Sequence, residues 1–319
     1  MSLEEINLAA IEAARERIAG HVRHTPLAAS ATLSRELGTH IYLKQELFQK
    51  TGSFKVRGAF NKMLPLPRGS QVVAVSGGNH AQAVAYAAAQ LGMQARILMP
   101  ESTPANYVEA TRGYGAGIVL AATIADAFAQ ADAAVAEGWA MVHPFDDPEV
   151  MAGQGTLALE LLDDLPEVTD VIVSIGGGGL MAGVASAVKA RNPDVRLWGV
   201  ETEGADAMAQ ALAAGKIVRL PAITSIAKTL GAPAVSEATL AAARQYLESV
   251  TVVSDHEAVA ALRFLLERAK LLTEPAASCT LAAARRLAPH FTPSSHVVLI
   301  LCGGNLAVKD LCAWTARGL

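Results

Sequence analysis

The sequence predicts an α/β fold of two interleaved three-layer α/β/α domains with open, mostly parallel sheets. From residue 71 onward, short apolar strand runs alternate with Ala-rich helical runs, which is typical of strand–helix–strand units. The runs 171–173 and 297–301 are apolar at every position, as expected of parallel strands covered on both faces. A chain of 319 residues has room for two domains, and no linker or repeat separates them, so we expect them to be interleaved.

The first 65 residues carry the first predicted elements. Ser2 and Glu5 have the spacing of a capping box, which predicts a helix that runs to about Ile18. A short strand is predicted at 41–44, after the turn signal at 25–26. Ser53 is a residue type that caps helices, and it predicts a helix with Lys55 in its first turn.

The regular alternation of elements begins at residue 71. The predicted strands are apolar runs at 71–76, 95–100, 117–121, 139–143, 169–175, 196–201, 250–254 and 296–302. The predicted helices lie between most of them and are rich in alanine, a strong helix former, at 80–92, 124–137, 180–191 and 256–272.

The composition excludes several classes of function. The chain is 52% hydrophobic and 18% charged, which is unlike a disordered chain. Its net charge of -4 comes without a basic run, and only 5% of its residues are aromatic, so we expect no nucleic acid and no membrane as partner. The uncharged stretch 171–188 is interrupted by four glycines, which favours a strand, a turn and a helix over a membrane span.

Cysteine usage and the N-terminal residues predict a cytoplasmic protein. Cys279, Cys302 and Cys312 are an odd number of widely spaced cysteines, which fits neither a disulfide framework nor a zinc motif. The N-terminal Met-Ser-Leu-Glu-Glu-Ile carries acids where an export signal needs basic residues.

Three glycine-rich junctions follow predicted strands and open into helices or turns. They are Ser-Gly-Gly-Asn-His at 76–80, four glycines at 176–179, and Cys-Gly-Gly-Asn at 302–305. In open α/β sheets, ligands bind at the carboxyl ends of strands, where helix N-termini point. Any one junction can be a tight turn, whereas three in one chain predict a site built from several strand ends.

The glycine run 176–179 predicts an anion site, because its backbone N–H groups can hold a phosphate at a positive helix end. No Lys-Ser/Thr pair follows, so it is not a nucleotide P-loop. Gly177, Gly179 and Ala182 also fit the dinucleotide pattern G-x-G-x-x-A, with Glu201 at the end of the next strand as a ribose-binding acid. The glycine run is therefore compatible both with a single bound phosphate group and with NAD.

Lys55 is the candidate reactive amine. Near a helix N-terminus, the positive dipole end and partial burial both lower the pKa of a lysine, which favours the free amine that a Schiff base requires. A solvated lysine on an amphipathic helix would show the same local pattern.

The segment 53–59, Ser-Phe-Lys-Val-Arg-Gly-Ala, resembles the cofactor-lysine motif of the serine/threonine dehydratase and serine racemase family. These are pyridoxal-phosphate (PLP) enzymes of fold type II, the tryptophan synthase β class. The resemblance continues in family order over nearly the whole chain, through the motifs at 76–82, 152–156, 176–179, 270–275 and 302–305. We therefore expect a large PLP-binding domain at 1–65 and 147–319, and a small substrate-side domain at 66–146.

The resemblance implies a role for each motif position. Lys55 would form the Schiff base with PLP and remove the substrate Cα proton, and Phe54 would pack against the cofactor ring. The other implied cofactor contacts are Asn79, Gly176, Gly177, Gly178, Gly179, Glu274 and Cys302. The implied substrate-binding residues are Ser76, Gly77, Asn79 and His80.

The implied position of the Cys302 thiol, facing the pyridine nitrogen, favours elimination. A thiol does not hold that nitrogen protonated as an aspartate would, so the ring is a weaker electron sink and prompt loss of a β-substituent is favoured. The expected products are a 2-oxo acid and ammonia.

The chain departs from the family pattern at three places. It has Gly77 where serine racemases carry a serine that acts as acid or base on the face opposite the lysine. Of the racemase-like divalent-metal site, Glu201 and Ala205 match, but Ala207 replaces the second carboxylate, so that a monovalent cation or water is the alternative occupant. The family's Ile-Ala-Asp-Gly reads Ile-Ala-Lys-Thr at 226–229.

These observations predict a cytoplasmic, homodimeric PLP-dependent ammonia-lyase that acts on a small amino-acid substrate, L-serine or L-threonine. Dehydration of 3-hydroxyaspartate or a bulkier β-hydroxy amino acid, β-replacement and serine racemisation stay open within the family, as does a member that only binds a ligand. An NAD-binding oxidoreductase is the alternative from another class, and it leaves Lys55 without a role.

Overall fold

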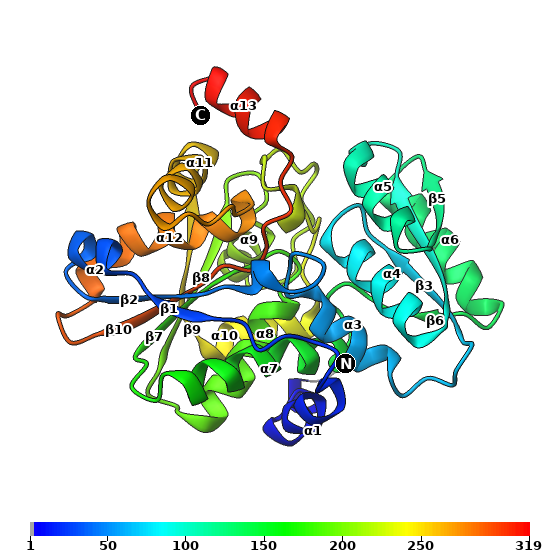
Figure 1. The fold of residues 1–319 in the computed structure, drawn as a ribbon, viewed down its shortest axis with the longest axis horizontal. Helices are drawn as coiled ribbons and strands as arrows, with labels where there is room; N and C mark the ends of the chain where they lie inside the picture. The colour runs from blue at the N-terminus through cyan, green and yellow to red at the C-terminus, as the bar shows by residue number, and fades with distance from the viewer. Residues whose placement is uncertain (1–2) are drawn as a thin grey trace.

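The computed structural model describes residues 3–319 (Figure 1). The predicted capping residue Ser2 lies outside these residues. The first α-helix, α1 (Leu8–Ile18), is instead capped by Asn7, whose side chain accepts a hydrogen bond from the backbone N–H of Ala10.

The strands form two sheets, which Figure 1 shows as separate groups. The larger sheet has the order β1-β2-β10-β7-β8-β9, with β1 (Leu27–Ala29), β2 (His40–Lys44), β7 (Asp170–Ser174), β8 (Arg196–Thr202), β9 (Leu247–Val253) and β10 (His296–Ile300). The smaller sheet has the order β5-β4-β3-β6, with β3 (Gln71–Val75), β4 (Gln94–Pro100), β5 (Gly117–Ala121) and β6 (Ala140–Met141). All neighbouring strands are parallel except β1 and β2, so the predicted open, mostly parallel sheets are confirmed.

Helices cover both sheets. Besides α1, the helices that do not flank the smaller sheet are α2 (Ala31–Leu37), α3 (Lys55–Met63), α7 (Pro148–Asp164), α8 (Gly179–Arg191), α9 (Ala207–Ala214), α10 (Glu237–Tyr246), α11 (Asp255–Phe264), α12 (Pro275–Leu287) and α13 (Val308–Ala316). Those beside the smaller sheet are α4 (Asn79–Leu91), α5 (Ala105–Gly113) and α6 (Ile124–Ala136).

The alternation of side chains along β3 explains the three layers around the smaller sheet. Val72 and Ala74 belong to a core that includes α4, whereas Val73 and Val75 belong to a second core with α6. Successive side chains of a strand point to opposite faces. Because β3 is apolar at nearly every position, helices pack against both faces of the sheet.

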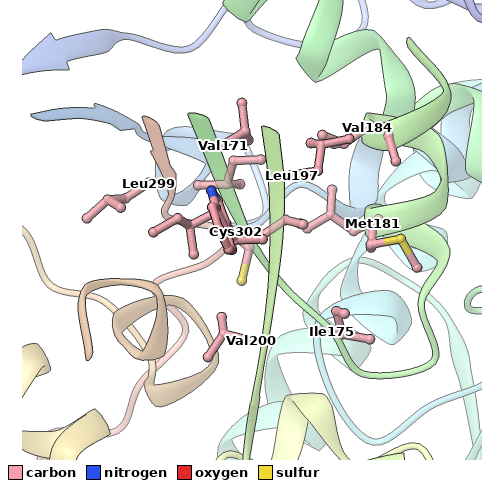
Figure 2. Close-up of a cluster of buried hydrophobic side chains, with 14 of the residues drawn as sticks. Val171, Ile175, Met181, Val184, Leu197, Val200, Leu299 and Cys302 are labelled. Atoms are coloured by element: carbon pink, nitrogen blue, oxygen red, sulfur yellow. The ribbon is translucent and has the colours of Figure 1, made fainter. Parts of the chain in front are cut away.

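The largest core lies around the middle of the larger sheet. Figure 2 shows Val171, Leu197 and Leu299 on three neighbouring strands, with Met181 and Val184 of α8 beside them. All five side chains are fully buried. Close packing of this kind fixes the strands relative to α8, and it therefore fixes the junctions at the strand ends.

Most predicted strands and helices begin and end within two residues of the observed ones, and the differences have local causes. The edge strand β1 is three residues long, too short for a periodic pattern, and β9 begins three residues before the predicted start. In the segment predicted as one helix over 256–272, the α-helix α11 ends at Phe264. A π-helical turn (Leu265–Ala269) follows it, and the helical conformation stops at Lys270, which has a left-handed φ of 61°.

The smaller sheet takes all its strands from residues 71–141, which lie inside the predicted small domain at 66–146. The domain boundaries themselves stay a prediction. None of the helices in the described part of the chain combines the length and the apolar character that a membrane span requires.

Candidate active site

Two of the three predicted junctions meet around the segment 302–305. The backbone N–H of Phe54 donates to the carbonyl of Cys302 (3.0 Å), and that of Glu274 donates to the carbonyl of Gly303 (3.1 Å). Asn305 Nδ2 donates to Oδ1 of Asn79 in the first junction (2.8 Å). Segments from four distant parts of the chain thus form one cluster.

Lys55 is the first residue of α3, as predicted, but Ser53 does not cap this helix. The N-cap is Phe54, which has no capping side chain. Ser53 instead pairs with Gly303 in an isolated β-bridge, and its Oγ is buried with no hydrogen-bond partner among the described residues. The prediction of a Ser53 cap is wrong because this backbone pairing takes the residue away from the helix end.

The Lys55 amine lies among protein atoms although the side chain keeps some contact with solvent. Nζ donates to the carbonyl of Pro144 (2.6 Å) and lies 5.1 Å from the centroid of the Phe54 ring. Burial lowers the pKa of Lys55 to about 8, against opposing attraction from Cys302 and Glu274. The lowered pKa favours the unprotonated amine, as a nucleophile or base requires.

A buried ionic cluster anchors α3 two residues after the amine. The Arg57 guanidinium donates to Glu46 (2.9 and 2.8 Å) and to Glu160 of α7 (2.7 and 2.8 Å). Lys44 Nζ also donates to Glu160 (2.7 Å). Two cations and two anions balance each other, and paired charges of this kind are costly to separate. The cluster therefore holds the start of α3 in place.

Glu274 precedes α12 and receives two donors on one oxygen. Asn79 Nδ2 (2.8 Å) and Thr229 Oγ1 (3.0 Å) both donate to Oε1, while Oε2 is buried without a partner among the described residues. Burial raises the pKa of Glu274 to about 7, and the donated hydrogen bonds and nearby Lys55 oppose this rise. The carboxyl group is therefore able to hold or release a proton near neutral pH.

The loop 76–80 connects β3 to α4. Ser76 Oγ accepts from the backbone N–H of Gly78 (3.1 Å), and a Cβ atom added at Gly77 would lie 2.5 Å from Thr103 Oγ1. The His80 ring is directed to the carbonyl of Val142 through Nε2 (2.8 Å), and burial lowers its pKa to about 3. His80 is thus a neutral, buried ring, whereas the N-terminal N–H groups of α4 lack intrahelical acceptors.

Gly178, the third glycine of the run, has a left-handed conformation (φ 92°) and is the N-cap of α8. Its neighbours leave no room for side chains. A Cβ atom at Gly177 would overlap the Phe145 ring, and one at Gly176 would lie 3.0 Å from the carbonyl oxygen of Leu230. The run therefore presents backbone N–H groups at the start of a helix, which is the arrangement that binds phosphate.

Cys302 follows β10 at the carboxyl end of the larger sheet (Figure 2). Ser174 Oγ donates to its Sγ (3.4 Å), and burial raises the pKa of the thiol to about 12. Cys302 therefore stays a neutral thiol at physiological pH, beside the Lys55 amine and Glu274, whose charges act on it.

The family model described as "Pyridoxal-phosphate dependent enzyme" matches residues 18–303. The chain belongs to this family. It is 44% identical to an L-threonine ammonia-lyase of Geobacter sulfurreducens over 316 residues, which is 97% of this chain and 78% of the relative. It is 38% identical to an L-threo-3-hydroxyaspartate ammonia-lyase of a Pseudomonas species, over 93% of this chain and 94% of the relative. The structure of maize serine racemase superposes with a TM-score of 0.92 at 37% identity, covering 98% of this chain and 97% of that one.

The residues of this PLP-dependent enzyme fit the cofactor. Lys55 offers an amine with a lowered pKa, and Cys302 offers a neutral thiol. The glycine run forms a backbone cradle that Cβ atoms would obstruct. Ser53 Oγ and Glu274 Oε2 are buried polar atoms without partners among the described residues. An aldehyde that carries a phosphate and a polar ring matches this donor set.

Glu201, the predicted ribose-binding or metal-binding acid, lies at the end of β8 and binds backbone groups of the next helix. Its carboxyl group accepts hydrogen bonds from the backbone N–H groups of Met208 (2.9 Å) and Ala209 (2.8 Å), at the start of α9. Burial raises its pKa to about 8. Within residues 3–319, no three His, Cys, Asp or Glu side chains gather as metal ligands. The NAD alternative is therefore wrong, because its acid caps a helix and the family is that of PLP enzymes.

Sequence reasoning missed several residues that the structure brings to the site. Tyr107 of α5 donates to the carbonyl of Asn305 (2.7 Å). This hydrogen bond connects a helix beside the smaller sheet to the segment that follows β10 of the larger sheet. Phe145 covers the glycine run, and Thr229 contacts Glu274. Asn305 lies in the predicted junction 302–305, and the sequence assigned it no role. A signal existed only for Asn305 and Thr229, because each lies in a segment that the family resemblance had marked.

Proposed function

We propose that this chain is a PLP-dependent dehydratase that converts L-serine or L-threonine into a 2-oxo acid and ammonia by α,β-elimination. The observation that carries this proposal is the convergence of the Lys55 amine, the neutral Cys302 thiol and the helix N-termini of α4 and α8. Relatives named as ammonia-lyases at 38–44% identity support the same reaction class.

The site offers an anion position at each of two helix ends. The four glycines at the start of α8 would hold the cofactor phosphate, and the loop with Ser76, Gly77, Asn79 and His80 would bind the substrate carboxylate at the start of α4. Phe54 would pack against the cofactor, and Asn79 and Glu274 would lie beside it. Bound PLP supplies an electron sink for the pair released from the Cα–H bond.

Lys55 then acts as the base. Its lowered pKa leaves part of the amine unprotonated at neutral pH, so that it can take the Cα proton. The Cα–H and Cβ–O bonds break, and the proton that Lys55 has taken is available for the departing hydroxyl group, which leaves as water. A second water then replaces the amino group, which is released as ammonia. The neutral Cys302 thiol would not keep the pyridine nitrogen of the cofactor protonated. The ring is then a weaker electron sink, which favours prompt loss of the β-hydroxyl group.

The test of this function is a panel of β-hydroxy amino acids with a 2-oxo acid assay. We expect release from L-threonine or L-serine at rates well above those from threo-3-hydroxyaspartate and from bulkier substrates. A preference for 3-hydroxyaspartate would contradict the proposed substrate and would support the activity that is named for the Pseudomonas relative. No 2-oxo acid from any member of the panel would refute the elimination proposal.

We also propose that the protein is a cytoplasmic homodimer with the domain division given above. Three free cysteines, two of them buried, suit a reducing compartment. The dimer follows the family resemblance, and sedimentation of the holoenzyme tests it directly.

Removal of divalent metal ions should cost this enzyme little activity. Ala207 supplies no carboxylate, and the Glu201 carboxyl is already used to cap α9, so a hard divalent cation lacks its oxygen ligands. Dialysis against a chelator, followed by the 2-oxo acid assay, checks this expectation. A large loss that magnesium or calcium restores would contradict it, and a dependence on potassium or sodium would place a monovalent cation there.

A further inference from the structure

The 3₁₀ turn η3 (Lys228–Leu230) contacts three parts of the site at once. The backbone of Leu230 lies against Gly176 of the glycine run. Thr229 Cγ2 lies 3.3 Å from the position of a Cβ atom at Gly78, in the loop before α4. Thr229 Oγ1 donates to Glu274 Oε1 (3.0 Å). The hydroxyl end of one small side chain thus binds Glu274, while its methyl end lies beside the loop before α4.

The hydroxyl end is one of the donors that hold the Glu274 carboxylate. Asn79 Nδ2 donates to the same Oε1 atom (2.8 Å), and Asn305 in turn holds the Asn79 side chain. With both donors on Oε1, the second oxygen is directed to a buried position without a partner among the described residues. Removal of the Thr229 hydroxyl would leave Asn79 as the single side-chain donor to that carboxylate in the described contacts.

The methyl end of Thr229 lies beside the loop 76–79. Gly78 is the N-cap of α4, and no side chain of its own fills the space beside it. Thr229 Cγ2 lies beside the space that a Cβ atom at Gly78 would take, so this methyl group borders the loop that would bind the substrate carboxylate.

We propose that Thr229 is a positioning residue for the elimination reaction. Its hydroxyl group fixes the Glu274 carboxylate, and its methyl group supports the loop that binds the substrate carboxylate. This inference rests on the proposed function only for its kinetic readout, because the contacts of Thr229 exist in the apoprotein.

Charged and titratable groups from several elements face Glu274. They are Lys55 of α3, Tyr107 of α5, Cys279 of α12 and Cys302 after β10. Burial raises the pKa of Cys302 to about 12 and raises those of Tyr107 and Cys279 well above their ordinary values. Lys55, with a pKa of about 8, is the one of these four that titrates in the same range as Glu274.

The first experiment therefore uses Lys55→Ala apoprotein and follows denaturant unfolding from pH 5 to pH 9. Burial raises the pKa of Glu274 to about 7 in the presence of Lys55, and the Lys55→Ala substitution removes one influence that lowers it, so the folded pKa in this variant is at least as high. The stability linked to the Glu274 proton is present below pH 4.5 and is lost as pH rises through the folded pKa. Loss of a hydrogen bond to the ionised form raises the folded pKa further. We expect the unfolding constant of Thr229→Val, relative to Thr229→Ser, to grow about tenfold between pH 5 and pH 9.

The second experiment measures kinetics of the holoenzyme with Lys55 intact. Thr229→Val should lower kcat and move the ionisation that reports Glu274 upward by about one pH unit. Thr229→Ser keeps the hydroxyl group, so its pH profile should match the wild type while KM rises through the loosened loop. Thr315→Val, in the exposed helix α13, is the matched control and should change neither quantity.

The outcomes separate the two proposals. Equal pH dependence of unfolding for Thr229→Val and Thr229→Ser would overturn the role of the hydroxyl, whatever the reaction is. If Thr229→Val does not fold, Thr229→Ala lacks the same hydroxyl and replaces it in both measurements. A wild-type enzyme that releases no 2-oxo acid would refute the proposed function, and the unfolding series would still decide the role of Thr229.

Discussion

Replacement of Lys55 by alanine should abolish 2-oxo acid release and the visible absorption band of lysine-bound PLP, while the protein stays folded. The amine is the one nucleophile at the head of α3, and its side chain makes a single described hydrogen bond, to the Pro144 carbonyl. Alanine is a strong helix former, so α3 should persist. Circular dichroism and the absorption spectrum, recorded on the same sample, check both parts.

Lys50→Ala is the matched control, because Lys50 is an exposed lysine five residues earlier. It should keep both the band and the rate. If Lys55→Ala also kept both, the assignment of the reactive amine would be wrong.

The lowered pKa of Lys55 also predicts how PLP capture depends on pH. With a pKa of about 8, roughly one amine in ten is unprotonated at pH 7, against about one in three thousand for a lysine of pKa 10.5. The rate at which the apoprotein captures PLP should therefore rise with pH through about 8 and level off above it. A rate that continued to rise to pH 10 would contradict the described environment of the amine.

With L-serine, release of pyruvate should exceed formation of D-serine by a factor of ~10²–10⁴, the usual contribution of a placed acid or base. Racemisation needs a second group that returns the proton on the face opposite Lys55. The family resemblance implies that the residue at position 77 supplies this group in serine racemases, and here position 77 is a glycine without a side chain. Chiral chromatography beside the 2-oxo acid assay measures the ratio. D-serine produced as fast as pyruvate would mean that an unrecognised group reaches that face.

Gly77→Ser should raise racemisation relative to elimination once the new side chain has room. The backbone at Gly77 lies outside the left-handed region, so a serine is conformationally allowed, but its Cβ would lie 2.5 Å from Thr103 Oγ1. Gly77→Ser combined with Thr103→Ala removes this contact and is expected to give the larger change. Thr103→Ala alone is the control and should leave the ratio at its wild-type value.

Local pattern was enough to predict the elements that surround the site. Apolar runs predicted β7, β8 and β10, and alanine-rich runs predicted α4, α6 and α8. The glycine run was found for the same reason, since a phosphate cradle depends on a few adjacent residues. Lys55 was singled out by the family resemblance of the segment 53–59, because its local pattern alone also fits a solvated lysine. The segment 256–272 was predicted wrongly because its helix ends through a left-handed Lys270, a conformation that composition does not reveal.

The amino-acid sequence by itself determined the alternation of strands and helices, the position of the candidate reactive lysine, the glycine run and the missing side chain at position 77. Tertiary structure alone decided where the polar side chains of the site are directed. Ser53 pairs with Gly303 rather than capping α3, Glu201 caps α9, and Thr229 contacts Glu274. The physical reason is that backbone conformation depends mainly on neighbouring residues, whereas the partner of a buried polar group is whichever donor or acceptor the packing of distant segments brings within hydrogen-bond distance.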